Sequence, residues 1–250
     1  MTPLLAHAPI DEVIVGFVLD RAAGPDAVEA GIYLAERKDR FVRHEIHEPI
    51  ISEVSLGEAV LMPFPSPARI WLVSADDIWL VQLQQDRFHA NWRRRGEATY
   101  PGFTRTGGVM QFVLDEFERV REFCKRRKGD APNPASVEVS KIDLLIQGKH
   151  WESIDDVAAL LPSIAAAPKS MATPGPHVAL QLQEDVGGIT LTISISPARL
   201  KADPTRGVFR LEFRARQAAS GDLAAQLVQV NDVLNRGFAR LIPDAERRFA

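Results

Sequence analysis

A segment rich in proline and small residues near the middle of the chain separates two stretches with the same order of hydrophobic patterns. This segment, 128–136, follows a charged run with helical spacing and has the composition of a linker. A chain of 250 residues is long enough for two domains of ordinary size. We therefore expect one domain at 1–128 and a second at 129–250.

The first stretch predicts a strand, a helix, three strands and a second helix. A β-branched apolar run at 12–19 predicts a buried strand, and apolar residues at helical spacing within 26–37 predict a helix. Asp76-Asp77 is typical of a hairpin turn between two further strands. These strands, the next strand and a long amphipathic helix are expected at 69–73, 78–84, 87–92 and 109–123.

The second stretch predicts the same order of elements. Its strand, short helix, three strands and long helix are expected at 137–146, 153–161, 178–184, 189–195, 208–216 and 223–241. The sequence thus predicts an α+β fold with two similarly patterned β-α-β-β-β-α halves packed into one body. Each half has an antiparallel sheet covered by a long helix, and the two halves are expected to pack sheet edge to edge or face to face. Because two small open sheets leave unpaired edges, we also expect self-association or complex formation through sheet edges or the long helices.

Composition favours a protein of the cytoplasm. Cys124 is the single cysteine, which excludes an internal disulfide and suits a reducing compartment. The first ten residues lack the features of a signal peptide, and no apolar run approaches the ~20 residues of a membrane span. The formal net charge of −3 provides no global attraction to nucleic acid or membranes.

The segment His44–Glu48 is the first candidate for a chemical site, because it reads His-Glu-Ile-His-Glu. The spacing places the histidines neither one helical turn apart nor on one face of a strand, so an exposed polar strand or loop is favoured over a metal site. Phosphate-binding glycine loops and nucleophile motifs are absent from the sequence, and Cys124 lies within an apolar helix. No catalytic residue, cofactor or metal is therefore predicted.

A basic stripe from Arg87 to Lys128 is the second candidate. Basic residues outnumber acidic ones there, whereas acidic residues prevail in 11–86. An aromatic ring beside three arginines can stack a base while the arginines bind phosphates. The competing interpretation is structural, since basic side chains complement a helix C-terminus and pair with nearby acidic residues. In that case Trp92 covers a sheet end while Asn91 and Arg93 satisfy backbone groups. The candidate residues for binding a partner or nucleic acid are Arg87, Asn91, Trp92, Arg93, Arg94, Arg95, Lys125, Arg126 and Arg127.

Three consecutive arginines, Arg93–Arg95, end the third strand of the first stretch. A buried guanidinium without a carboxylate costs several kcal/mol, so at least one of the three is expected to reach solvent. We expect all three on the surface, close to the cationic end of the 109–128 helix, as the main contact patch for a partner.

The block Gln84–Arg93, with Tyr100–Phe103 and the helical segment Phe112–Phe117 downstream, resembles a family. The opening segment Ala8–Ile14 shares that family's proline–apolar–acidic pattern. The chain thus resembles a sporadically distributed family of uncharacterised bacterial and archaeal proteins of about 250 residues. The resemblance implies no catalytic residue. It implies a role as an accessory protein of a mobile element or of antiviral defence, because the family's distribution is patchy.

These observations favour a non-catalytic binding or scaffold protein that contacts a macromolecular partner, either another protein or a second copy of the chain. One alternative is a nucleic-acid-binding protein that uses the basic stripe. Another is an enzyme whose site is assembled from distant residues, for instance His89 with Asp86 or Glu45.

Overall fold

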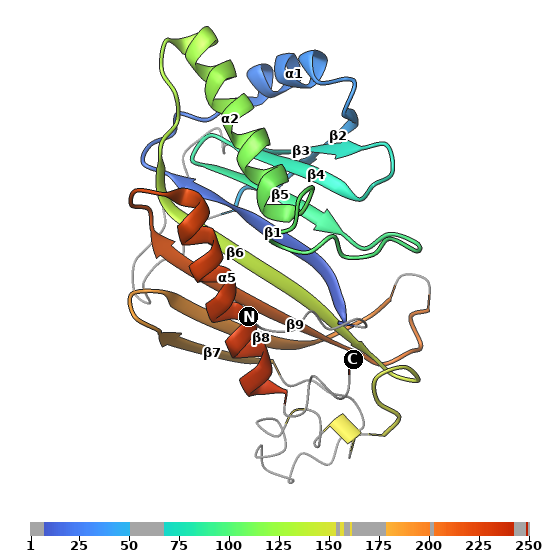
Figure 1. The fold of residues 1–250 in the computed structure, drawn as a ribbon. Helices are drawn as coiled ribbons and strands as arrows, with labels where there is room; N and C mark the ends of the chain where they lie inside the picture. Colours follow the sequence, from blue (N-terminus) through green and yellow to red (C-terminus); the bar gives the residue numbers. More distant parts are fainter. Residues whose placement is uncertain are drawn as a thin grey trace. The chain divides into compact units, whose positions relative to one another are not determined.

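The computed structural model describes residues 8–50, 68–153, 156–157, 161, 179–200, 203–242 and 249. No helix in this described part of the chain is both long enough and apolar enough to cross a membrane. The elements in chain order are β1 (Ile10–Leu19), α1 (Ala27–Glu36), β2 (Phe41–His47), β3 (Arg69–Ser74), β4 (Trp79–Gln84), β5 (Arg87–Arg93), α2 (Val109–Lys128), β6 (Pro134–Ile146), β7 (Leu180–Asp185), β8 (Thr190–Ala198), β9 (Val208–Ala218) and α5 (Leu223–Leu241) (Figure 1).

The described strands form one nine-stranded antiparallel sheet in the order β2-β3-β4-β5-β1-β6-β9-β8-β7. The predicted α+β class is confirmed. One continuous sheet replaces the two sheets that were expected to pack edge to edge or face to face, and no repeat of two matching halves is evident. The reason is that β1 and β6, the first strands of the two predicted halves, are hydrogen-bonded neighbours. This pairing satisfies backbone groups that two separate sheets would leave unpaired.

The chain divides into two compact units, and each is described by itself. The first comprises Met1–Val13, Glu138–Gln217 and Ala225–Ala250. The second comprises Ile14–Val137 and Ala218–Ala224. The predicted boundary between residues 128 and 129 stays a prediction.

In the second unit, α2 packs against one face of strands β4 and β5 (Figure 1). The apolar stripe predicted for this helix makes the contact: the Phe112 ring lies 4.3 Å from Trp79, and the Phe117 ring lies 5.2 Å from Phe88. The helix runs past its predicted end to Lys128 and stops at Gly129, whose φ of 77° suits glycine at a helix C-terminus.

Strand β2 is the element that the pattern analysis did not define. It pairs antiparallel with β3, and the register is irregular between Phe41 and Arg43. The His44–Glu48 segment is therefore mostly strand, which ends at His47. Its sequence shows no alternation of apolar and polar residues that would predict a strand. The reason is that β2 is an edge strand in which only Phe41 is buried.

In the first unit, α5 has the predicted bounds of 223–241 and packs on the sheet. The Phe238 ring lies 5.6 Å from Phe213 of β9. The short helix predicted at 153–161 falls largely outside the described residues, although Asp156 and Val157 are helical. Ser153 behaves as the predicted N-cap, since its hydroxyl accepts a hydrogen bond from the Asp156 amide at 3.3 Å.

Candidate anion-binding cluster

Side chains of β5 alternate between two faces of the sheet, and both faces are buried. Phe88 and Trp92 lie on the face that α2 covers. The opposite face is polar, and a polar group in such a position needs a hydrogen-bond partner. Its buried polar residues on β4 and β5 are Gln82, Gln84, Arg87, His89, Asn91 and Arg93.

Trp92 is 1% exposed, so it is not available to stack a nucleic-acid base. Its Cα partner on β4 is Trp79, and its ring lies 5.2 Å from the ring of Tyr100. The interpretation of Trp92 as a contact residue is therefore wrong. The physical reason is that the ring lies on the same face of β5 as Phe88, where α2 excludes solvent.

Asn91 and Arg87 are also buried, which corrects their expected role as surface contacts. The side-chain oxygen of Asn91 accepts a hydrogen bond from the Gln82 amide at 2.9 Å. Arg87 Nη2 lies 3.3 Å from a carboxylate oxygen of Asp86. Both side chains thus hold the polar face of the sheet together.

Asp77, in the turn between β3 and β4, is the centre of a group of arginines. Its Oδ1 accepts hydrogen bonds from Nη2 of Arg43 and from Nη2 of Arg93, both at 2.6 Å. Its Oδ2 accepts one from Nε of Arg95 at 2.7 Å. We call these four residues the arginine cluster. It brings β2, the β3–β4 turn and the end of β5 together.

The three arginines at the end of β5 differ in exposure. Arg93 is 6% exposed, so the prediction that it lies on the surface is wrong. It is buried because it finds Asp77, whose carboxylate offsets the cost of desolvating a guanidinium. Arg94 and Arg95 are partly exposed, which confirms that at least one of the three reaches solvent.

The β3–β4 turn holds Asp77 in place. Asp77 has a φ of 60°, in the left-handed region that aspartate and asparagine tolerate better than most residues. Asp76 fixes the turn, because its Oδ1 accepts hydrogen bonds from the Ser74 hydroxyl at 2.5 Å and the Ile78 amide at 3.0 Å. Sequence analysis assigned Asp76-Asp77 only a turn role, since nothing local shows that Arg43 returns to the same place.

The pKa of Asp77 is lowered from its ordinary value. Partial burial alone would raise this pKa, but hydrogen bonds from Arg95 and Arg43 and the charge of Arg93 outweigh burial. The hydrogen bond to Asp77, with a smaller contribution from Glu45, raises the pKa of Arg43. Asp77 is therefore ionised at neutral pH and stabilises the fold above its unfolded-state pKa; this contribution is lost as the pH falls through the lowered value.

Replacement of Asp77 by asparagine is expected to lower the free energy of unfolding by about 2 kcal/mol at neutral pH. The asparagine side chain keeps the turn geometry but removes the negative charge of Asp77 from beside the buried guanidinium of Arg93. The difference from wild type should shrink in acid, where Asp77 is protonated. Urea unfolding at both pH values checks this, with Asp39→Asn as control at a carboxylate that is 71% exposed. Equal effects of the two variants would contradict the account.

Trp71 of β3 lies beside the arginine cluster and is surrounded by cationic groups. The guanidinium of Arg93 lies 5.9 Å from its ring centroid, and that of Arg69 lies 5.5 Å away. The His47 ring stacks on it at 3.9 Å. The Trp71 ring thus contacts side chains of the protein itself and is not exposed as a surface on which a base could stack.

The two histidines of the His44–Glu48 segment are not brought together by the strand. His44 pairs in register with Leu72 and His47 with Arg69, an odd spacing that places them on opposite faces of β2. His47 Nε2 lies 3.2 Å from Glu45. Among the described residues, no group of three or more side chains suitable for a metal ion is present.

The basic end of α2 lies at the opposite end of β5 from the arginine cluster. Phe112 near the start of α2 packs beside Trp79, the partner of Trp92, whereas Phe117 further along packs on Phe88. The helix therefore runs antiparallel to β5. The expectation that Arg93–Arg95 lie close to the cationic helix end is wrong, because the direction of α2 on the strand was not encoded locally.

Two cations at the end of α2 bind α1. Arg126 pairs with Glu36 at 2.8 Å, and Lys128 pairs with Glu29 at 2.6 Å. Lys125 and Arg127 are exposed. This arrangement favours a structural role for part of the basic helix end and leaves a binding role of Lys125, Arg126 and Arg127 a prediction.

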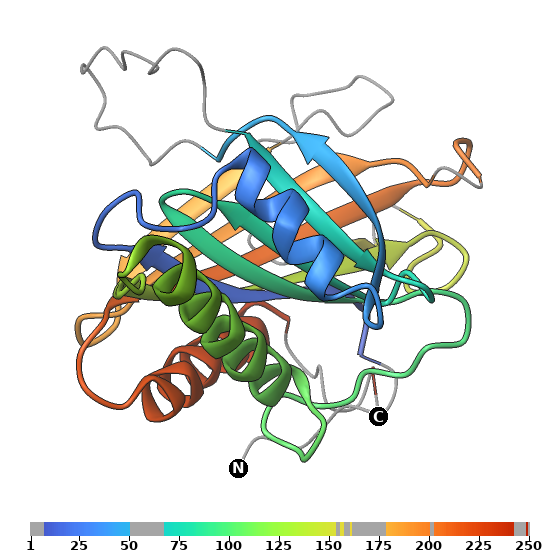
Figure 2. The ribbon, with the colours of Figure 1, turned by 90° about the horizontal axis from the view of Figure 1, so that it is seen from above.

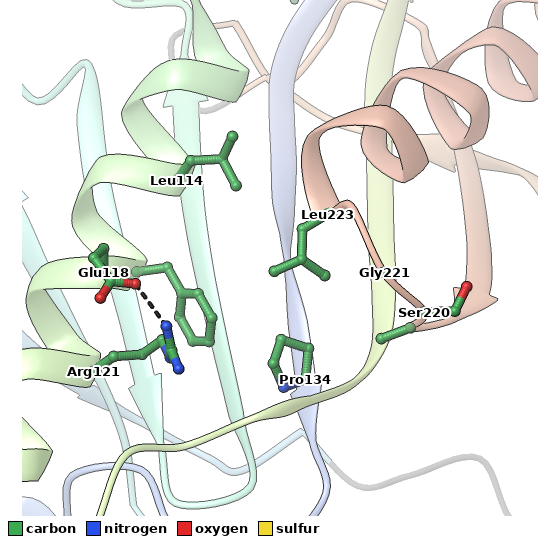
Figure 3. Close-up of a pocket in the computed structure, with 9 residues that line it drawn as sticks. Leu114, Glu118, Arg121, Pro134, Ser220, Gly221 and Leu223 are labelled. Carbon is green, nitrogen blue, oxygen red and sulfur yellow. Dashed lines mark hydrogen bonds and ion pairs between the residues drawn. The ribbon is translucent and has the colours of Figure 1, made fainter.

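A pocket of about 380 Å³ lies in the second unit, away from the predicted site residues (Figure 3). Phe117 and Leu114 from α2, Leu223 and Pro134 provide apolar walls. Glu118 and Arg121 are joined by an ion pair of 2.7 Å at its side. Pro134, which lies in the predicted linker segment 128–136, also lines the pocket, and the sequence predicted no binding role for it.

His89, the histidine of the enzyme alternative, is 2% exposed and pairs in register with Gln82. Asp86 accepts a hydrogen bond from the Gln84 amide at 2.6 Å, and Glu45 accepts one from Arg43 at 3.1 Å. Both carboxylates thus take part in structural contacts. The assembled His89 site stays a hypothesis.

Comparison of the chain with protein-family models, with curated proteins and with solved structures finds no significant match in any of the three.

Proposed function

We propose that this chain is a non-catalytic binding protein that contacts an acidic protein partner through the arginine cluster. The single observation that carries the proposal is that three guanidinium groups converge on the one carboxylate of Asp77. Such a site has more hydrogen-bond donors and more positive charge than its own aspartate can satisfy.

The excess charge faces solvent at two of the three arginines. The side chains of Arg43 and Arg95 are 46% and 37% exposed, whereas that of Arg93 is 8% exposed. Glu45 neutralises part of the charge of Arg43 at 3.1 Å. An incoming carboxylate can therefore bind the exposed donors while Asp77 keeps Arg93 in place.

An acidic protein surface fits this cluster better than nucleic acid does. Single-stranded nucleic acid is usually held by basic groups together with exposed aromatic rings on which bases stack. Here Trp92 is buried and Trp71 is stacked against His47. Nucleic-acid binding by the basic stripe remains the alternative, and it would have to rely on phosphate contacts alone.

The family resemblance extends the proposal to a biological setting. A binding protein with a macromolecular partner and no assigned chemistry fits an accessory component of a bacterial defence or mobile-element system. The enzyme alternative would instead require a substrate to reach His89, which is buried.

Reversal of Arg95 to glutamate is expected to reduce recovery of the partner at least several-fold in a pull-down from the native host. Glutamate at this position removes one donor and repels acidic groups, so association slows. Arg119→Glu, on the exposed face of α2, makes the same change in net charge outside the cluster and should retain wild-type recovery. Mass spectrometry and nucleic-acid staining of the same eluate identify the class of partner.

Two outcomes of the pull-down would count against the proposal. If Arg95→Glu and Arg119→Glu recover the same partners as wild type, the cluster is structural only. If the recovered material is nucleic acid and Arg95→Glu weakens it, the alternative function replaces the proposed one. Circular dichroism of each variant ensures that loss of binding does not reflect loss of fold.

A further inference from the structure

β2 is an edge strand, and most of its side chains are exposed. Among the described strands it is bonded only to β3, so its outer backbone groups have no described strand as partner. Figure 2 shows β2 at the side of β3 with α1 next to it. Ile46 is 71% exposed and Val42 is 61% exposed, which places them among the most exposed large apolar residues of the described chain.

Charged residues interrupt the apolar ones along β2. Arg43 and Glu45 lie two positions apart, hence on one face of the strand, and their side chains are 3.1 Å apart. Isolated edges often carry charges to discourage pairing. On β2, however, one face has a positive and a negative side chain. In an antiparallel copy of the same strand these two charges occur in reverse order, so each charge can face its opposite and pairing is not discouraged.

We propose that two copies of this chain pair through β2 in an antiparallel, two-fold symmetric ladder centred on His44. In this register Arg43 of each copy lies directly opposite Glu45 of the other. Val42 of each copy lies at the level of Ile46 of the other. Opposite charges and apolar pairs placed across two strands each stabilise the pairing, and here every such pair occurs twice because of the two-fold symmetry.

The neighbouring registers are less complementary. A ladder centred on Glu45 places two glutamates directly opposite each other, which is destabilising. A ladder centred on Ile46 leaves Arg43 beyond the end of the paired segment. The register irregularity of β2 lies between Phe41 and Arg43, at Val42, so it falls on the outer Val42–Ile46 pairs and leaves His44 and the Arg43–Glu45 pairs in regular register.

Arg43 belongs both to the arginine cluster and to the proposed ladder. The two proposals can still fail separately, because the dimer is tested by mass and the proposed function by recovery of an acidic partner. Light scattering across a concentration series should give the mass of a dimer for the wild type. Ile46→Asp should give the monomer mass. Leu182→Asp, on β7 at the other edge of the described sheet and 42% exposed, should leave the dimer intact.

Cysteine cross-linking tests the register. His44→Cys faces its own copy in the proposed ladder and should form a disulfide-linked dimer on mild oxidation. The native Cys124 is buried and should not react. Ile46→Cys lies about 13 Å along the strand from its own copy and should stay monomeric on denaturing gels.

The results that would overturn the proposal are distinct. A wild-type monomer at all concentrations excludes the dimer. A dimer broken by Leu182→Asp but not by Ile46→Asp places the interface at another edge. Cross-linking of Ile46→Cys in place of His44→Cys excludes the register. Because both positions are exposed, circular dichroism of these variants should match wild type.

Discussion

The free energy of unfolding is expected to rise by about 3 kcal/mol between about pH 8 and pH 10.5 because of one buried lysine. Lys141 of β6 lies under α5, where its Nζ donates a hydrogen bond to Asn235 Oδ1 at 2.7 Å. Burial lowers the pKa of Lys141 from 10.5 to about 8, and this effect exceeds the opposing influence of Asp143 and Asp232.

The direction follows from proton binding in the two states. Between about pH 8 and 10.5 the folded protein has released the Lys141 proton, whereas the unfolded chain still binds it. Stability therefore increases with pH wherever the unfolded state binds more protons, and the increase ends near the unfolded-state pKa. Below about pH 8 both states are protonated and Lys141 adds no pH dependence.

Urea unfolding at a series of pH values measures this rise. Lys141→Gln has no titrating group at this position, so its stability should change much less over the same range. Lys125→Gln, at an exposed position of α2, should keep the full rise. A rise of equal size in Lys141→Gln would show that other groups cause it, and a flat wild-type curve would contradict the account of Lys141.

Replacement of Gly16 by alanine is expected to lower the free energy of unfolding by about 4 kcal/mol or more, or to prevent folding. Gly16 lies on β1, the hydrogen-bonded neighbour of β5. A β-carbon there would lie 2.0 Å from the carbonyl oxygen of Phe88 and 2.7 Å from the Cα of His89. These are backbone atoms, so the two strands would have to move apart.

Gly31→Ala in α1 is the matched control for this change. A β-carbon at position 31 meets nothing within 4 Å, and alanine favours a helix over glycine by about 0.5–1 kcal/mol. Gly31→Ala should therefore be slightly more stable than wild type in urea unfolding. If the two alanine variants unfolded at the same urea concentration, the result would contradict the close approach of the β1 and β5 backbones at Gly16.

The helices were largely predictable from sequence because each depends on a local apolar stripe. The predicted 223–241 helix agrees with α5 in both bounds, and the stripe of α2 contacts the sheet as expected. The β3–β4 hairpin was also predictable from its alternating strands and Asp76-Asp77 turn. The single sheet was not, since the pairing of β1 with β6 depends on segments far apart in the chain.

The candidate site was only partly predictable for the same reason. The sequence drew attention to Arg93–Arg95, and Arg95 is partly exposed as expected. It did not show that Asp77 and Arg43 would join them, because that requires the β2–β3 register. It also left open whether Trp92 stacks on a ligand or covers a sheet end, since a strand with polar and apolar alternation does not reveal that both faces will be buried.

Binding of a labelled polyglutamate peptide to Asp77→Asn tests the central claim most directly. If the arginine cluster binds acidic partners, Asp77 competes with them for its three guanidinium groups. Fluorescence anisotropy should show that Asp77→Asn binds the peptide several-fold more tightly than wild type, and that Arg95→Glu binds it several-fold more weakly. The affinities of wild type and of Asp77→Asn for the peptide should fall as the salt concentration rises. Tighter binding by Asp77→Asn cannot be explained by partial unfolding of the arginine cluster, which would weaken binding. Equal affinities of wild type, Asp77→Asn and Arg95→Glu would contradict the proposed function.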